Sequence, residues 1–450
     1  MPAGPGLPRA LPVLGYAVKF AKAPLPLVES LRSAGDVLRF RLGPQTIFWV
    51  NHPDLVRQVL AGAARFEKGR QADKLRVIVG NGLVTALGDY HRRHRRLVQP
   101  AFHRGRIAEY VRTMHAYTVE ELRQWRDGEP IEADQHFARL TLRVVGKTLF
   151  STSLGDAAVD EVVRSVPFVL TEFGRRIRDP LGLRGRLPTA ANRAFDAAIG
   201  RLHAVVDRLV AEYRAAGVDQ GDVTSMLLLA RDEETGEGLT DAEVRDEVLT
   251  LLAAGTETTA NILSWAVHHL GERPDLEARV HAEVDEVLGE RTVTIDDLAR
   301  LAFVRCVILE TLRLYPQAWI LTRRTTEPVT LGSARLPAGA SVFFAPYALQ
   351  RDPAVYPEPA TFDPGRWADD RSTLTQRPSF VPFGGGRRQC IGDVFAMTEL
   401  AVVLVTIAQQ WRLVPVAGVR VRIDFSSTLK PDRLPMTPQR RAGADPTRTR

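Results

Sequence analysis

The chain has 450 residues, 45% of them apolar, and a formal net charge of +7. The apolar content suffices for one extended core. The only two cysteines, Cys306 and Cys390, exclude a disulfide scaffold. The basic run at residues 91–96 leaves nucleic-acid binding open as an alternative, but no aromatic residue interleaves it and no known nucleic-acid module accompanies it.

No linker and no internal repeat divides the chain, so we predict one domain over residues 1–437. Residues 438–450 are basic and poor in apolar side chains, which predicts a disordered tail. The first residues lack a signal peptide, and no apolar run approaches the roughly 18 residues of a membrane span. We therefore expect a cytoplasmic protein without a membrane anchor.

The first half of the chain is predicted to be mainly helical. Residues 37–50 alternate around Gly43-Pro44, which predicts a hairpin, and His52-Pro53 opens a short helix. Helical periodicity then dominates residues 104–288. We expect breaks at residues 128–130, at Asp179-Pro180 and at residues 231–238.

After Pro316 the pattern changes to short apolar runs between glycines and prolines. Strands are predicted within residues 328–345, and a meandering loop is predicted over residues 352–367. A final helix is expected to start at Cys390 and to bury residues 400–408. The predicted fold class is mainly α with a minor β portion near each end.

One long helix, over residues 246–270, contains the string AGTETT at residues 254–259. Glycine, an acid and threonines conflict with helix propensity and with the cost of burying polar groups. Such conflicts tend to mark functional sites. Packing between helices through small residues is the structural alternative.

Glu310 and Arg313 are three residues apart and lie on one face of a predicted helix. Apolar residues flank both, so we expect the pair to be buried, and a buried pair requires further hydrogen bonds. An ordinary surface pair is the alternative.

Cys390 lies in the string FGGGRRQCIG at residues 383–392, a glycine-rich loop that leads into an apolar helix. A helix dipole and loop N–H groups can stabilise a thiolate, and Phe383 can shield it from water. A lone cysteine cannot build a zinc or iron–sulfur site, but it can hold a heme iron from one side. A buried structural cysteine is the alternative.

The spacing F-x-x-G-x-R-x-C-x-G, with Phe383, Gly386, Arg388, Cys390 and Gly392, resembles the heme-binding motif of the cytochrome P-450 family. The resemblance covers roughly residues 8–437. It implies the single-domain fold of that family, heme b as the cofactor and Cys390 as the iron ligand. It also implies that Phe383, Gly386 and Gly392 shape the heme pocket.

The resemblance assigns roles to further residues. Thr258 would hydrogen-bond the oxygen being activated, and Glu257 would relay protons through water. His91, Arg95, Arg323 and Arg388 would bind the heme propionates, with Arg324 open as the alternative to Arg323. A network of Glu310, Arg313 and Arg366 would brace the Cys390 loop.

Arg92, Arg93 and Arg96 would then face outward, where a basic surface suits an acidic electron-transfer protein, and a solvated charged face is the alternative. The implied partners are O2, a ferredoxin and an NAD(P)H-dependent ferredoxin reductase, because no flavin or iron–sulfur domain is fused to the chain.

Substrate-facing positions come from the family resemblance. They are residues 75–87, residues 168–173, Leu251, Ala254, Trp319, Ile320 and Leu321. These side chains are mostly apolar, so we expect a compact apolar substrate.

Residues 81–85, 91–103, 319–324 and 347–359 resemble actinobacterial sesquiterpene oxygenases of the pentalenene oxygenase type. This resemblance implies oxidation of a polycyclic sesquiterpene in terpenoid antibiotic biosynthesis, from a methyl group to the alcohol and on to the aldehyde. Oxidation of a macrolide or a fatty acid, a peroxide-driven heme enzyme and a non-catalytic heme-thiolate sensor are the alternatives. The acid–alcohol pair Glu257-Thr258 disfavours the last two.

Overall fold

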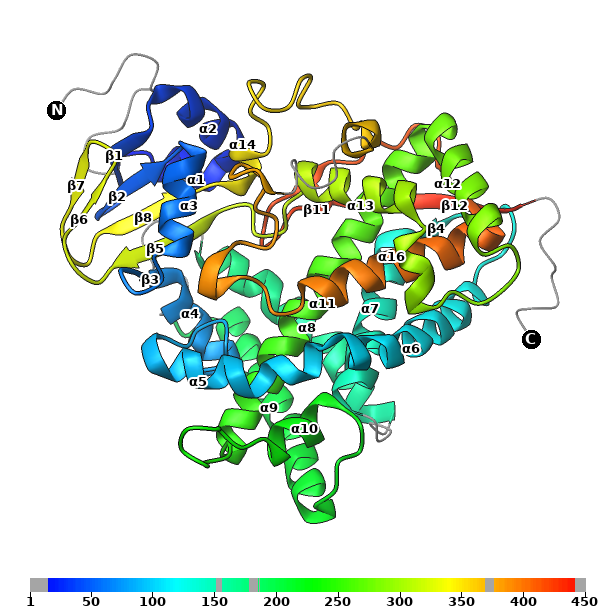
Figure 1. Cartoon of the computed structure of the whole chain (residues 1–450), viewed down its shortest axis with the longest axis horizontal. Coiled ribbons are helices and arrows are strands. Elements are labelled where there is room, and N and C mark those ends of the chain that lie inside the picture. Colours follow the sequence, from blue (N-terminus) through cyan, green and yellow to red (C-terminus); the bar gives the residue numbers. More distant parts are fainter. Residues whose placement is uncertain (1–14, 151–155, 178–184, 186, 369–375, 442–450) are drawn as a thin grey trace.

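The computed structural model describes residues 15–150, 156–177, 185, 187–368 and 376–441. A sheet with short helices around it lies at one side of the molecule, and longer helices make up most of the rest (Figure 1). The predicted mainly α fold with a minor β portion is confirmed.

The helices are α1 (Ala17–Lys22), α2 (Pro24–Leu31), α3 (Pro53–Ala61), α4 (Arg70–Val79), α5 (Gly88–Val98), α6 (Arg104–Leu122), α7 (Ala133–Leu149), α8 (Asp156–Ile177), α9 (Ala190–Ala216), α10 (Val223–Leu229), α11 (Asp241–Glu272), α12 (Pro274–Val287), α13 (Ala302–Leu314), α14 (Pro346–Leu349) and α16 (Asp393–Gln410).

The strands are β1 (Val37–Leu42), β2 (Gln45–Val50), β3 (Phe66–Lys68), β4 (Ile131–Glu132), β5 (Leu321–Thr325), β6 (Val329–Leu331), β7 (Ala334–Leu336), β8 (Ser341–Phe344), β9 (Trp411–Pro415), β10 (Ile423–Asp424), β11 (Lys430–Pro431) and β12 (Pro435–Arg440).

The main sheet has the strand order β1-β2-β8-β5-β3, in which β2 and β8 are parallel and the other neighbours are antiparallel. The predicted hairpin is confirmed, because Leu42 pairs with Gln45 across Gly43-Pro44. Gly43 has φ of +60°, which favours glycine at this turn. The predicted short helix after His52 is confirmed as α3, and His52 caps it by accepting the Asp54 N–H at 3.2 Å.

The helix α11 runs across the middle of the molecule and packs against α7, α9 and α16 (Figure 1). A capping box of Thr240 and Glu243 starts it, and Pro274 opens the next helix directly after it. The predicted breaks at residues 128–130 and 231–238 are confirmed, whereas Asp179-Pro180 lies outside the described residues. The strands β6, β7 and β8 confirm the prediction for residues 328–345.

Two predicted boundaries are wrong. The last helix begins at Asp393, three residues after Cys390, because the Cys390 N–H donates to Phe383 O at 2.9 Å and keeps this residue in the loop. The fold also continues past residue 437. Residues 438–440 belong to β12, where Arg440 pairs with Trp411, so strand pairing outweighs their low apolar content.

Within the described residues, α16 is the one helix long and apolar enough to cross a membrane, and 61% of it is buried inside the protein. The predicted burial of residues 400–408 is confirmed. This helix is therefore accounted for as a core helix that carries the Cys390 loop at its start.

Candidate functional site

Glu310 and Arg313 are both 0% exposed, which confirms the predicted buried pair. Arg313 donates to both Glu310 oxygens, at 2.9 Å from Nε and 2.8 Å from Nη2. Arg366 Nε, Trp367 Nε1 and the Asp363 N–H donate to the same carboxylate at 3.1, 2.9 and 2.9 Å. These five bonds supply the partners that a buried carboxylate requires.

A residue that the sequence reasoning missed links this network to the Cys390 loop. Gln350 is 0% exposed, and its Nε2 donates to the carbonyls of Leu312 and Arg313 at 2.9 and 3.0 Å. Its Oε1 accepts the Val381 N–H at 3.0 Å, two residues before Phe383. One amide side chain therefore links the helix of Glu310 and Arg313 to the Cys390 loop, and the sequence carried no signal for it.

The Cys390 loop lies close to the end of α3. Gly386 has φ of +63°, and a Cβ there would stand 2.2 Å from Leu60 O, so this position requires glycine. Cys390 is accessible to solvent. Many protein atoms nevertheless surround the thiol, and the resulting loss of hydration raises the pKa of Cys390. The Gly392 N–H and the charges of Arg95 and Lys68 act in the opposite direction.

Basic side chains gather beside this loop from four parts of the chain. We call the set the cation cluster, and its members are Lys68, His91, Arg95, Arg323 and Arg388. Burial lowers the pKa of Lys68 to about 7, and the charges of Arg323 and Arg388 add to that effect. Burial lowers the pKa of Arg323 to about 10, and the charge of Arg388 makes a smaller contribution in the same direction. Lys68 and Arg323 pair across β3 and β5, and positive charges this close lower one another's pKa values.

The pKa of His91 falls to about 3, first through burial and then through Arg388, Lys68 and Arg95. Its imidazole is therefore neutral at pH 7 and can still donate one hydrogen bond.

The arginines of the cluster donate to backbone carbonyls. Arg388 reaches Ala86 O at 2.6 Å, Arg95 reaches Gln389 O at 2.7 Å and Arg323 reaches Thr322 O at 2.9 Å. In the described part of the chain, none of the five members forms an ion pair with a carboxylate within 4.0 Å. Buried charges are usually paired, so the cluster is suited to an anion with more than one acidic group.

The structure distinguishes Arg323 from its neighbour. Arg323 is 3% exposed and lies on β5 opposite Lys68 of β3, whereas Arg324 lies opposite Glu67. Successive strand residues point to opposite faces, so Arg323 is the member of the cluster. Lys68 was not predicted, because a three-residue strand has no readable pattern and its partner strand lies far along the chain.

In α11, the Thr258 hydroxyl donates to Ala254 O at 2.7 Å, the back-bonding that threonine makes inside helices. Ala254 is exposed, although Leu251 and Leu252 just before it are buried. The helix therefore presents a polar hydroxyl and an open surface in the middle of an otherwise buried stretch.

Glu257 points toward the segment between β10 and β11. Its Oε1 accepts from Ser427 Oγ at 2.6 Å and from Thr428 Oγ1 at 2.9 Å, and Lys430 Nζ lies 4.0 Å away. These three residues were not predicted. Ser427 and Thr428 hold the acid through hydroxyl groups, which can pass protons.

The predicted substrate-facing residues occupy several elements. Leu251 and Trp319 are buried, Ile320 is half-buried, and α8 carries an exposed Phe168. The Trp319 ring stacks on Phe20 of α1, with ring centroids 6.2 Å apart.

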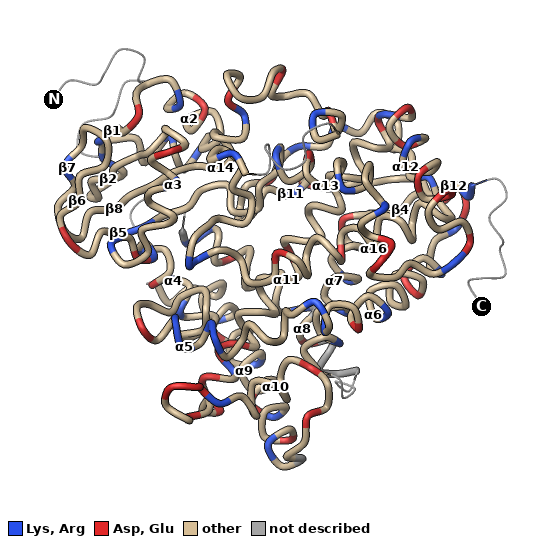
Figure 2. Tube along the Cα trace, viewed as in Figure 1, with Lys and Arg blue, Asp and Glu red and all other residues tan. Residues whose placement is uncertain are grey.

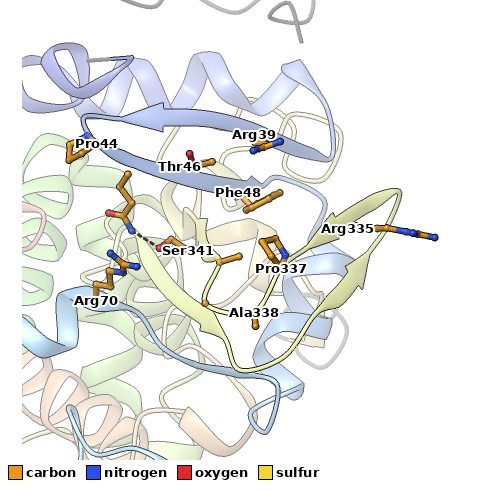
Figure 3. Close-up of a pocket in the computed structure, with 12 residues that line it drawn as sticks. Arg39, Pro44, Thr46, Phe48, Arg70, Arg335, Pro337, Ala338 and Ser341 are labelled. Carbon is orange, nitrogen blue, oxygen red and sulfur yellow. Dashed lines mark hydrogen bonds between the residues drawn. The ribbon is translucent and has the colours of Figure 1, made fainter. Parts of the chain in front are cut away.

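A pocket of about 470 Å³ lies elsewhere, between the β1–β2 hairpin and residues 335–341 (Figure 3). None of the predicted site residues lines it.

The basic run on α5 is largely paired within the chain, and Figure 2 shows acidic residues near this helix. Arg93 was predicted to face outward, which is wrong. Its side chain is 19% exposed and donates to Glu243 at 3.2 Å and to Gly238 O at 2.6 Å. Arg92 and Arg96 are exposed, but they pair with Asp89 at 2.6 Å and Asp232 at 2.9 Å. Acidic side chains on α5, at residues 232–234 and on α11 thus neutralise much of the run.

The model of the cytochrome P450 family matches residues 5–437. Cyclooctatin synthase of Streptomyces melanosporofaciens is 45% identical over 96% of this chain and 95% of that protein. Cyclooctat-9-en-7-ol 5-monooxygenase of the same organism is 42% identical, over 95% of this chain and 94% of that protein. Pentalenene oxygenase of Streptomyces avermitilis is 41% identical, over 92% of each chain.

Proposed function

Since the chain belongs to the cytochrome P450 family and is a monooxygenase, we propose that it inserts one oxygen atom from O2 into an unactivated C–H bond of a polycyclic terpene. The cation cluster beside Cys390 is the observation that carries the proposed site. The three similar oxygenases support the terpene as the substrate class. A cytoplasmic location and electron supply by a ferredoxin and its NAD(P)H-dependent reductase are parts of the same proposal.

The residues present fit heme b. The carboxylates of its two propionates would supply the anionic partners that Lys68, Arg95, Arg323 and Arg388 do not have among the described residues. The neutral His91 can donate a further hydrogen bond to a carboxylate. Cys390, two residues after Arg388 in the same loop, would offer one thiolate ligand. When bound, a thiolate-ligated heme supplies dioxygen activation, because the thiolate pushes electron density that favours O–O cleavage.

The chain itself would manage protons and orientation. Glu257 takes protons from the side of Lys430 and the two hydroxyl groups that hold it. Thr258 holds a hydroxyl at the open surface of α11, where Ala254 O fixes its orientation. Leu251 and Ile320 contribute apolar surface, so a hydrocarbon would be oriented mainly by shape.

The assignment of Lys68 to the heme site predicts weaker heme binding in Lys68→Met. One charge-assisted hydrogen bond is worth about 1.5–3 kcal/mol, which corresponds to roughly 10-fold to 100-fold faster heme loss. Heme transfer to an excess of apomyoglobin, followed by absorbance, measures this rate. Lys74→Met is the matched control, because Lys74 is exposed on the neighbouring helix α4. Equal rates in the wild type and in Lys68→Met would contradict the assignment.

For the substrate, we propose a sesquiterpene such as pentalenene, oxidised at a methyl group to the alcohol and on to the aldehyde. The resembling segments and the similarity to pentalenene oxygenase support it. Two further relatives, one of them named for cyclooctat-9-en-7-ol, make that alcohol the natural competitor.

A reconstituted system with a surrogate ferredoxin and reductase tests the substrate. It would receive pentalenene, cyclooctat-9-en-7-ol, a fatty acid and a macrolide in parallel, with products followed by mass spectrometry. We expect pentalenene to be oxidised, and related terpenes to bind as well, because one methylene is worth only about 1–3 kcal/mol in an apolar pocket. Turnover of cyclooctat-9-en-7-ol without pentalenene would reject the sesquiterpene. Turnover of only the fatty acid or the macrolide would reject the terpene.

A further inference from the structure

Residues 80–87, which we call the α4–α5 segment, lie directly on α11 just before Leu251. The Asn81 N–H donates to Asp246 Oδ2 at 2.7 Å, and the Leu83 N–H donates to Glu247 Oε2 at 3.0 Å. A Cβ on Gly82 would stand 2.2 Å from Thr250 Oγ1, so only glycine permits this approach. Two carboxylates of α11 therefore hold the backbone of the segment.

Glu247 uses its second oxygen for a different element. Its Oε1 lies 2.6 Å from His94 Nδ1, and both side chains are 0% exposed. The other ring nitrogen of His94 lies 3.2 Å from Glu243 Oε1. One buried carboxylate thus joins α11, the α4–α5 segment and α5.

The far end of the segment is tied to the cation cluster. Arg388 donates to Ala86 O at 2.6 Å. Between the two ends, the buried Thr85 hydroxyl is within hydrogen-bond distance of Gly80 O and Gly82 O, at 2.8 and 3.1 Å. The segment is therefore internally closed and anchored at both ends, and Glu247 is the anchor that is fully buried.

We propose that Glu247 is a positioning residue that holds the α4–α5 segment closed on α11 and thereby sets how long a ligand stays beside Cys390. Lifting the segment breaks the Leu83 bond and leaves a buried carboxylate with one partner fewer, which disfavours opening. His94 holds the other oxygen of Glu247 and so orients the carboxylate toward the segment. The effect on ligands rests on the proposed function and on the expectation from the family resemblance that residues 75–87 face the substrate.

Hydrogen exchange read by mass spectrometry tests the clamp in the heme-loaded enzyme without any substrate. Glu247→Gln removes the negative charge, and a neutral amide oxygen is a weaker acceptor for the Leu83 N–H than a carboxylate oxygen. We expect exchange of peptides covering residues 80–87 to rise at least tenfold, while peptides from residues 260–272 stay unchanged. Glu277→Gln is the matched control. Glu277 of α12 is also buried and pairs with Arg412 of β9 at 2.8 Å. Equal exchange in the wild type and in Glu247→Gln would overturn the proposal.

A second measurement uses 4-phenylimidazole as the probe ligand, with its dissociation followed by stopped-flow absorbance. We expect about tenfold faster dissociation in Glu247→Gln and no change in Glu277→Gln. A lower unfolding temperature with unchanged exchange and unchanged dissociation would show that Glu247 only stabilises the fold, and the proposal would be wrong.

If Glu247→Gln does not fold, His94→Gln gives the same test in milder form, because the Leu83 bond remains possible. Its exchange at residues 80–87 should rise less, and no rise would refute the role of His94. Because exchange needs no terpene, failure of the substrate panel and failure of the clamp are separate results.

Discussion

Cys390→Ser should abolish the strongly red-shifted Soret band of the ferrous carbon monoxide complex. That band reports thiolate ligation, and a serine hydroxyl does not supply the electron density of a thiolate. Monooxygenase turnover should fall below detection in the same variant. Absorbance spectra of purified protein, scaled to total heme, measure the first effect, and product analysis measures the second.

Cys306→Ser is the matched control for this prediction. Cys306 lies in α13 and is 3% exposed, so its replacement should cost about 1 kcal/mol of folding stability, the usual size of a single substitution. The Soret band should be unchanged. The reverse pattern, with the band kept in Cys390→Ser and lost in Cys306→Ser, would show that Cys306 and not Cys390 is the ligand.

Features governed by neighbouring residues could be predicted from the sequence. The hairpin at Gly43-Pro44 and the helix after His52 depend on turn and capping chemistry within a few residues. The buried pair of Glu310 and Arg313 follows from helical spacing and apolar flanks. The family resemblance added the loop of Cys390 and the acid and alcohol of α11.

Features governed by distant contacts could not be predicted. Lys68 joins the cation cluster only because β3 pairs with β5. Gln350 braces the loop through two carbonyls and one amide that no local pattern links. Residues 438–440 look like a tail until β9 pairs with them. In each case the structure depends on a strand pairing or on a single buried side chain, and neither produces a periodic pattern in the sequence.

The outward orientation of Arg93 failed for a related reason. Helical spacing places a side chain on a face, but the acids opposite that face come from another element. Glu243 of α11 meets Arg93 and draws it into a half-buried pair. Charge patterns within one helix therefore predict its exposed side poorly when a neighbouring helix starts with acidic residues.

Thr258→Ala should separate electron consumption from product formation. The hydroxyl is the polar group that α11 presents at its open surface, and Glu257 beside it is held by groups that can pass protons. Under the proposed role of Thr258, loss of the hydroxyl would leave proton delivery to the activated oxygen undirected, and reducing equivalents should leave as hydrogen peroxide. Loss of one positioned proton-transfer group costs about 100-fold or more in many enzymes, so product per NAD(P)H should fall steeply. Substrate affinity should change little.

Thr256→Ala is the matched control for that variant. Thr256 lies two residues earlier on α11 and makes the same kind of bond, from its hydroxyl to Leu252 O at 3.1 Å, but it is 5% exposed. Both variants remove one hydroxyl from the same helix, so a general effect on α11 should appear in both. We expect hydrogen peroxide release to increase only in Thr258→Ala, measured beside NAD(P)H consumption and product. If product per NAD(P)H in Thr258→Ala equals that of the wild type, Thr258 has no part in directing protons.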